Sequence, residues 1–336
     1  MLAAALFGIS ATLNKIVLVD VHPLVVAGLI YFSAGILLVL IRFLPAFKKI
    51  SKKIQINTEN KELNRTNWFY LIIIAVCGAV IAPFLFLHGL NISTAVNASL
   101  LLNAEVLFTV FIAFIFLKER ANTKDYFAMI ILFLAAIVVT TNLNLSEINF
   151  TGKLLGNLFI IGGTLFWALD NSLSKKLGIE NDVVKVASFK SLIGGSIVIL
   201  IAIILQIPFN ITLHMIPYIL FVGFFSIGLS IVLFLSSLRM IGLMKTAVIY
   251  STSALFGALS AFIILGEPIS AIQLIAGTVM IYAIYLMSRK IDKTLSLNFS
   301  FKKNRNNKRF IPKKNIKERL LSNKTIFDSI RKKKIK

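Results

Sequence analysis

Long apolar stretches follow one another along most of this chain. An α-helix needs about 20 apolar residues to cross the hydrocarbon core of a bilayer. Several of the stretches are apolar on all sides, as a helix in contact with lipid must be. The sequence therefore predicts an all-α polytopic membrane protein with ten transmembrane helices, at 2–19, 23–44, 68–90, 94–117, 124–141, 153–174, 183–205, 214–238, 243–265 and 268–288.

The composition agrees with this fold class. Charged residues make up 15% of the chain, whereas a soluble domain typically carries about 25%. The only cysteine, Cys77, excludes an intrachain disulfide. The first residues, MLAAALFG, have no basic segment and no small-residue cleavage site, so we expect a retained helix and not a signal peptide.

Basic residues fall on alternate loops of this scheme. The segments 42–67, 118–124, 175–190 and 239–245 are rich in Lys and Arg, whereas the intervening segments contribute only Lys15 and Lys153. Because cytoplasmic loops carry the excess of positive charge, both termini are predicted to be cytoplasmic. The expected location is the plasma membrane.

The chain also contains an internal repeat at a constant offset of 148 residues. Between 107–119 and 255–267, seven of thirteen positions are identical, and Leu85-Phe86-Leu87 matches Leu233-Phe234-Leu235. A constant register over this distance indicates a duplication. Pro83 and Pro217 lie in matching parts of the third and eighth stretches, and we expect both to kink their helices.

Each copy contains five predicted spans, which is an odd number, so the second copy should be inverted relative to the first. Inverted repeats are typical of secondary transporters. The expected organisation is a first repeat at 1–141, a second at 142–288 and a cytoplasmic tail at 289–336. The tail holds 18 basic and 3 acidic residues, so anionic lipid headgroups are a candidate partner, and nucleic acid is a weaker one.

The ends of the fourth and ninth stretches read Leu117-Lys118-Glu119-Arg120 and Leu265-Gly266-Glu267-Pro268. Together with five helices per repeat and a mid-span glutamate, they resemble the EamA family of the drug/metabolite transporter superfamily. The resemblance implies a secondary transporter. Glu119, Glu267 and Pro268 are the residues that carry the family pattern, and we expect Glu119 and Glu267 to have structural roles at helix ends. The family often has Glu-Pro in the fourth helix; Val106 follows Glu105 here, so we expect no kink.

Glu105 is the first candidate site residue. It lies near the middle of the fourth stretch, on a helical face with small neighbours. The matching face of the ninth stretch contains Ser253 and Gly257, so we expect one cavity between the two faces. An apolar environment disfavours a charged carboxylate, so Glu105 is a candidate proton carrier. Alternatively, Glu105 pairs with a buried lysine and has only a structural role.

A second candidate site lies on the sixth and seventh stretches. Asp170 and Lys190 lie at similar depths on neighbouring antiparallel helices, so an ion pair is expected, either as a structural link or as part of a substrate site. Trp167 and Asn171 share the face of Asp170. Lys15 lies near the outer end of the first stretch, where its side chain can reach the interface or contribute to substrate binding.

The sequence favours transport of a small metabolite, such as an amino acid or a related compound, by alternating access, with proton coupling through Glu105. A multidrug or organic-cation exporter is the alternative, and a non-transporting membrane scaffold or an intramembrane enzyme is more remote. The chain has no H-E-x-x-H, G-x-S-x-G or Walker sequence, so we do not expect an enzyme. No cofactor or metal site is expected, and the sequence does not indicate an oligomeric state.

Overall fold

The computed structural model describes residues 1–43, 65–117, 123–141, 152–180, 182–241, 246, 249–283 and 285. The helical body belongs to one compact unit, Met1–Ser288. Glu119, the predicted tail at 289–336 and most of the predicted cytoplasmic loop at 45–67 lie outside the described residues.

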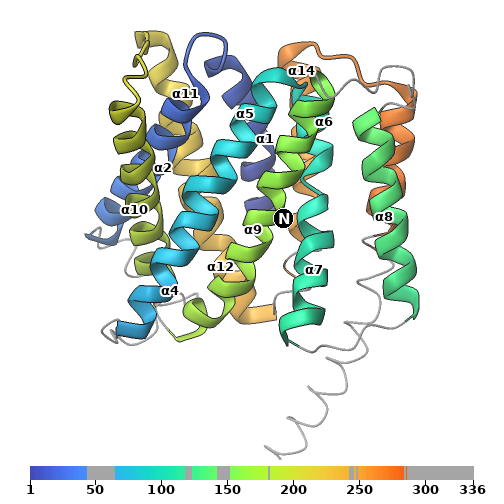
Figure 1. Ribbon diagram of the computed structural model, residues 1–336, viewed down its shortest axis with the longest axis horizontal. Coiled ribbons are helices and arrows are strands. Elements are labelled where there is room, and N and C mark those ends of the chain that lie inside the picture. Colours follow the sequence, from blue (N-terminus) through green and yellow to red (C-terminus); the bar gives the residue numbers. More distant parts are fainter. Residues whose placement is uncertain are drawn as a thin grey trace, which may run out of the picture. The chain divides into compact units, whose positions relative to one another are not determined.

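The described chain is helical and contains no strand, as the sequence predicts, and each of the predicted stretches contains helix (Figure 1). The elements are α1 Leu2–Val17, α2 Pro23–Phe43, α4 Arg65–Ala75, η1 Val76–Ile81, α5 Ala82–Ile92, α6 Ala95–Leu101, α7 Ala104–Leu117, α8 Thr123–Thr141, α9 Lys153–Glu180, α10 Val183–Ile204, η3 Leu213–Met215, α11 Ile216–Phe221, η4 Val222–Leu229, α12 Ser230–Ile241 and α14 Ser253–Leu265. A further apolar helix spans Ala271–Ala283.

Five helical segments are long and apolar enough to cross a membrane by length and composition: Pro23–Phe43, Arg65–Ile92, Lys153–Ser174, Val183–Ile204 and Leu213–Leu238. Shorter apolar helices accompany them. Many large apolar side chains remain exposed, among them Phe127 and Phe133 on α8 and Ile275 on the last helix. A soluble monomer rarely exposes so much apolar surface, so this is a multi-pass membrane protein.

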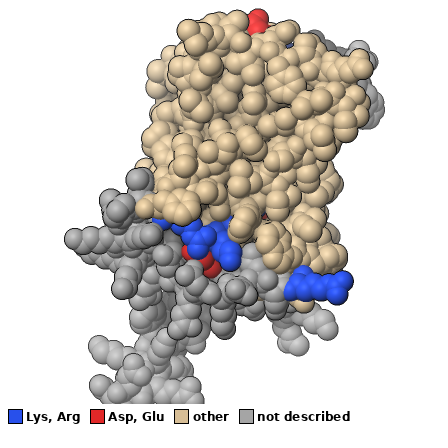
Figure 2. Space-filling model, turned by 90° about the vertical axis from the view of Figure 1, so that its left-hand side faces the viewer, with Lys and Arg blue, Asp and Glu red and all other residues tan. Residues whose placement is uncertain are grey.

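The two ends of the helical body differ in charge. α1 runs toward the end where Lys15 lies, and α2 returns to the opposite end, where Arg42 occupies its last turn. These are called the Lys15 end and the Arg42 end below. On the face seen in Figure 2, Lys and Arg side chains gather at one end with an acidic side chain beside them, another acidic side chain lies at the opposite end, and a broad band between the two ends shows no charged side chain. This distribution is typical of a protein held across a bilayer.

Pro83 shapes the third long helix. The backbone N–H of Ala82 donates to the Cys77 carbonyl, five residues back, within the π segment η1. The next donor is missing because Pro83 has no N–H, which leaves the Gly78 carbonyl free to accept from elsewhere. The helix is thus irregular directly before Pro83, and the kink expected at Pro83 stays a prediction. Pro217 lies in the first turn of α11, where a proline is tolerated, so a kink caused by Pro217 is a wrong prediction.

The fourth predicted helix is broken, contrary to the expectation of a straight helix at Glu105. α6 ends at Leu101 and α7 begins at Ala104. Across the break the hydrogen bonds shorten to three-residue spacing, with Glu105 N donating to Leu102 O at 3.0 Å and Val106 N donating to Asn103 O at 3.1 Å. The break therefore forms without proline.

Helix irregularities recur at the 148-residue offset. Shifting η1, 76–81, by that offset gives 224–229, which falls within η4, Val222–Leu229. The bond from Val106 N to Asn103 O has a counterpart from Ala254 N to Ser251 O, also 3.1 Å long. Since π segments are uncommon inside helices, their matching positions agree with the sequence repeat.

Candidate functional site

A small cavity lies inside the helical body, with a volume of ≈ 40 Å³. At about 10–15 Å³ per water, it holds on the order of three water molecules. Helices from both predicted repeats contribute to its wall. The lining residues are Phe7, Tyr31, Glu105, Trp167, Asp170, Asn171, Lys190, Ile227, Ile231, Phe234, Leu235 and Tyr250.

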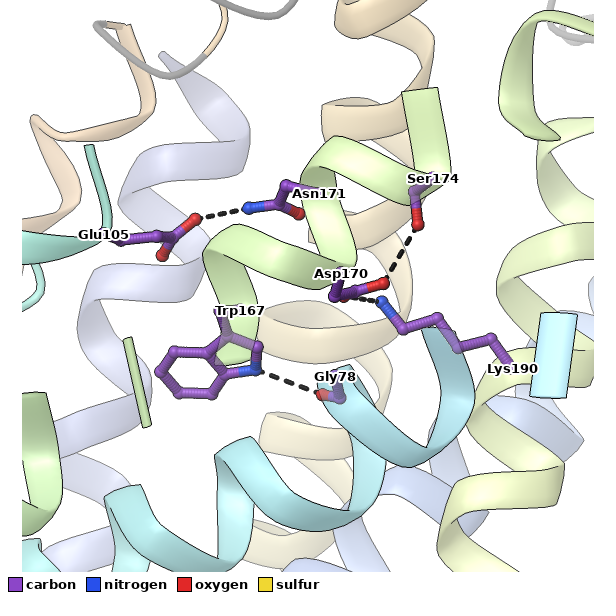
Figure 3. A network of polar contacts seen from close by, with 7 residues as sticks. All are labelled: Gly78, Glu105, Trp167, Asp170, Asn171, Ser174 and Lys190. Atoms are coloured by element: carbon purple, nitrogen blue, oxygen red, sulfur yellow. Dashed lines mark hydrogen bonds and ion pairs between the residues drawn. The ribbon is translucent and has the colours of Figure 1, made fainter. Parts of the chain in front are cut away.

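The ion pair predicted between Asp170 and Lys190 is present. The Lys190 ammonium donates to Asp170 Oδ2, and Ser174 Oγ donates to the other carboxylate oxygen, Oδ1, at 2.9 Å (Figure 3). The exposed fractions of Asp170 and Lys190 are only 1% and 4%. Both charges are therefore removed from solvent and balanced by each other, as buried ions must be.

Gly78 in η1 makes room for this pair. A Cβ atom on Gly78 would lie 2.1 Å from Asp170 Oδ2, so any side chain there would displace the carboxylate. The freed Gly78 carbonyl accepts a hydrogen bond of 3.1 Å from Trp167 Nε1, one turn before Asp170 on α9. The π segment thus fixes both Trp167 and Asp170 (Figure 3).

Glu105 joins the same network through Asn171. The Asn171 side-chain amide donates to Glu105 Oε1 at 2.5 Å, and Asn171 follows Asp170 directly in α9 (Figure 3). Glu105 is 8% exposed. Glu105 and the Asp170–Lys190 pair were predicted from the sequence as two candidate sites. In the structure, all three charged side chains line the same cavity.

The cavity wall combines net negative charge with aromatic rings. If all three ionisable groups are charged, two carboxylates face one ammonium, and Asp170 already neutralises that ammonium. Glu105 has a neutral amide as its hydrogen-bond partner. The rings of Phe7 and Trp167 meet edge to face at 5.5 Å. Such a wall can receive a proton or a cationic group beside an apolar body.

Two predicted cavity residues lie elsewhere. Ser253 and Gly257 are not among the residues that line this cavity. Gly257 packs closely against α1 and α6, where a Cβ atom would lie 2.9 Å from Gly8 O and 2.4 Å from Ser99 Oγ. The expectation that they face Glu105 across one cavity is wrong, because their small size serves helix packing.

Lys15 and Glu267 are also outside the cavity and bind helix ends. Lys15 Nζ donates to three backbone carbonyls at the end of α5: Leu90 O at 2.6 Å, Asn91 O at 3.0 Å and Ser93 O at 2.6 Å. Glu267 accepts from two backbone N–H groups at the start of α6, and the adjacent Pro268 is exposed. Among the described residues, no group of three His, Cys, Asp or Glu could hold a metal.

Sequence reasoning missed Tyr31 and Tyr250 as site residues. Tyr31 is 2% exposed and lines the cavity. The Tyr250 hydroxyl hydrogen-bonds Ser230 Oγ at 3.0 Å. Each is a polar aromatic residue within an apolar stretch, and Tyr31 is eleven residues, about three turns, from Arg42, the nearest charged residue of its own helix.

The fold and the site define an all-helical membrane protein with a buried, charged cavity, an arrangement typical of membrane transporters. The EamA-like transporter family matches residues 1–141 and 154–289, and the chain belongs to this family.

Known proteins similar to this chain bear the same general description. An uncharacterized transporter of Methanothermobacter thermautotrophicus is 38% identical over 286 residues, covering 85% of this chain and 83% of its own. The uncharacterized transporter YyaM of Bacillus subtilis is 22% identical over 259 residues, covering 76% and 81%. One crystal structure superposes with a TM-score of 0.60 at 12% identity, over 87% of this chain and 98% of its own, which supports the fold alone.

Proposed function

We propose that the protein is a secondary transporter that moves a small metabolite, such as an amino acid or a related compound, by alternating access at the central cavity. Glu105 is the group that couples movement of the substrate to that of a proton. The observation that carries this proposal is the buried network in which Glu105, Asn171, Asp170 and Lys190 meet. Ionisable groups inside a membrane are expensive and are usually functional.

Two inverted five-helix repeats, at 1–141 and 142–288, are part of the proposal. They are supported by the constant sequence offset, by the matching π segments and by two separate family matches. An inverted repeat lets the two halves exchange conformations, so that the cavity opens to one side and then to the other. At ≈ 40 Å³ the cavity is too small for a metabolite, so the lining helices must separate before substrate binds.

Proton coupling follows from the charge balance. Lys190 is held by Asp170, so an ionised Glu105 would leave one negative charge without a counter-ion in a buried site. Binding a proton removes this charge, and so does binding a cationic substrate group. Competition between the two at one carboxylate couples their fluxes. In this proposal the protein is located in the plasma membrane with both termini in the cytoplasm.

An organic cation is a second candidate substrate. The aromatic residues of the wall and its net negative charge favour an amine with an apolar body. A zwitterionic amino acid also needs a partner for its carboxylate, and Lys190 can supply one only by leaving Asp170. The two substrate classes therefore differ in whether the ion pair must open.

A ligand search is the first test. Purified protein is heated with single metabolites and organic amines, because a compound that binds the native state raises the unfolding midpoint. Binding of either class should be lost or weakened in Glu105→Ala, which removes the carboxylate.

The coupling test uses Glu105→Gln in proteoliposomes with the compound so found. The amide keeps the side chain's shape and cannot exchange a proton, so exchange of substrate should continue while accumulation driven by a pH gradient stops. If the Gln variant still concentrates the substrate with unchanged pH dependence, Glu105 is structural and the coupling proposal is wrong.

A further inference from the structure

The ion pair in the cavity wall, Asp170 and Lys190, lies nearer the Arg42 end than the Lys15 end. Asp170 is 17 residues from the start of α9 at the Lys15 end and 10 from its other end, which correspond to about 25 Å and 15 Å at 1.5 Å per residue. Lys190 is 7 residues from the start of α10 at the Arg42 end, or about 10 Å. A layer of protein therefore separates the cavity from the Lys15 end.

This layer consists of α1, α6 and α14 in close contact. A Cβ atom on Gly8 of α1 would lie 2.4 Å from Ser253 O of α14, and one on Gly257 would lie 2.4 Å from Ser99 Oγ of α6. One turn further along, Thr12 Oγ1 and Ser260 Oγ are hydrogen-bonded at 2.7 Å. Small residues let helices approach this closely in a membrane, and a Cβ atom on Gly8 would also lie 2.9 Å from the Cβ of Phe256 on α14.

At the Lys15 end of this three-helix contact, Glu267 links the end of α14 to the start of α6. Gly266 ends α14 in the left-handed conformation, with φ 66°, and this turn directs the next residue toward α6. Glu267 Oε1 accepts from Ala95 N at 3.0 Å, and Oε2 accepts from Val96 N at 2.9 Å. A carboxylate at a helix N-terminus also interacts favourably with the helix dipole.

α6 connects this fastening to the cavity. It is only seven residues long, Ala95–Leu101, and its other end is the break at Leu102–Asn103. Glu105 lies two residues beyond the break. A short helix fixed at one end by Glu267 and jointed at the other beside Glu105 can tilt without bending α7.

We propose that the contact of α1, α6 and α14 is the gate that closes the cavity from the Lys15 end, and that Glu267 is its latch. The close contacts at Gly8, Ser99 and Gly257 keep the gate closed. The gate opens when the hydrogen bonds from Ala95 N and Val96 N to Glu267 break and α6 moves away from α14. This inference rests on the proposed transport function and identifies the moving part. It also explains why small residues occupy α14 away from the cavity.

The test measures access to the cavity without any substrate. A reporter, Ile231→Cys, is placed in the cavity wall on a Cys77→Ser background and treated with a charged, membrane-impermeant maleimide. The reagent is added on the side from which Asn210→Cys is labelled, because Asn210 follows α10 at the Lys15 end. Glu267→Ala should raise the labelling rate about fivefold or more, as expected for loss of a helix cap. Glu267→Gln, which keeps one acceptor oxygen, should give an intermediate rate.

The matched control is Asp20→Ala. Asp20 is an exposed carboxylate at the same end, in the turn between α1 and α2, and it is not part of the latch. Its removal should leave the labelling rate unchanged, which separates the latch from a general effect of charge.

A second measurement does not depend on the reporter cysteine. Spin labels at Val19 and Ala271, both exposed at the Lys15 end, report the distance between α1 and the helix after α14. Glu267→Ala should shift the distance distribution toward longer values, and Asp20→Ala should not. If neither Glu267 variant changes labelling or distance in folded protein, Glu267 is a static cap and the gate proposal is wrong.

Failure of the transport proposal would look different. In that case no metabolite or amine would stabilise the protein and Glu105→Gln would have no phenotype, while the labelling experiment could still show an opening gate. If the protein transports substrate but the cavity cysteine is never labelled from the Lys15 end, the gate proposal is wrong and the transport proposal stands.

Discussion

Removing Lys190 gives a direct measure of what holds the buried network together. In Lys190→Met the Asp170 carboxylate keeps the Ser174 hydroxyl as a hydrogen-bond donor and loses its only counter-ion in the described network. Asp170 is 1% exposed, so bulk solvent does not reach the carboxylate to replace the lost counter-ion. Breaking a buried pair from one side costs about 3–5 kcal/mol, a factor of roughly 10²–10⁴ in the unfolding equilibrium at 1.4 kcal/mol per tenfold change.

The double variant Asp170→Asn/Lys190→Met distinguishes an ion pair from two independent residues. Asp170→Asn alone leaves a buried ammonium and should destabilise by a similar amount. With both charges gone, the loss should be small, because a buried pair replaced by neutral residues of similar size is often close to neutral in stability. The interaction energy in the double-mutant cycle should then be about 3 kcal/mol or more.

The assay is equilibrium unfolding in mixed micelles, followed by tryptophan fluorescence. Trp167 is a suitable reporter, since it packs against Phe7 and Phe86 at the cavity. Lys190→Met should be less destabilised at acid pH, because a protonated Asp170 has no charge to bury. If the two single losses add in the double variant at neutral pH, Asp170 and Lys190 are not energetically coupled and the ion pair does not hold the network together.

Two further predictions concern helix packing and orientation. Gly78→Ala should destabilise the protein by about 1–3 kcal/mol through overpacking in the same unfolding assay, whereas Gly162→Ala, whose Cβ would meet only Leu85 at 3.5 Å, should not; equal losses would contradict the role of Gly78. In intact cells, a cysteine replacing Asn210 should react with an impermeant reagent and one replacing Lys52 should not, and the reverse result would overturn the proposed orientation.

The fold class could be read from the sequence because lipid imposes simple requirements on it. Apolar length locates the helices, and counting residues from a helix end gives depth at a constant rise per residue. The similar depths of Asp170 and Lys190 in the membrane were sufficient to predict their ion pair. Depth was not enough to show that Glu105 lies beside them, because that depends on how each helix is rotated about its axis.

The wrong prediction that Ser253 and Gly257 line the cavity also arises because the sequence does not show how the helices are rotated and placed. Gly257 and Ser253 form a small-residue face, and such a face is suited equally to a cavity and to a close helix contact. Only the position of α1, with Gly8 opposite Gly257, decides between the two. The break at Leu102–Asn103 has no proline to mark it in the sequence, because a helix can also lose its regular spacing where neighbours supply other contacts.

The charge balance of the cavity places a limit on any mechanism that uses it. Lys190 and Asp170 neutralise each other within the wall, so under the proposed coupling the charge of Glu105 is balanced by a proton or a cationic substrate group. On the proposed mechanism, Glu105 is therefore never left ionised and unoccupied when the cavity is closed. It carries a proton or a cationic group in each passage. In the proposed gate, opening at the Lys15 end would tilt α6 about the break next to Glu105, so the step that admits solvent would also let this carboxylate exchange its occupant.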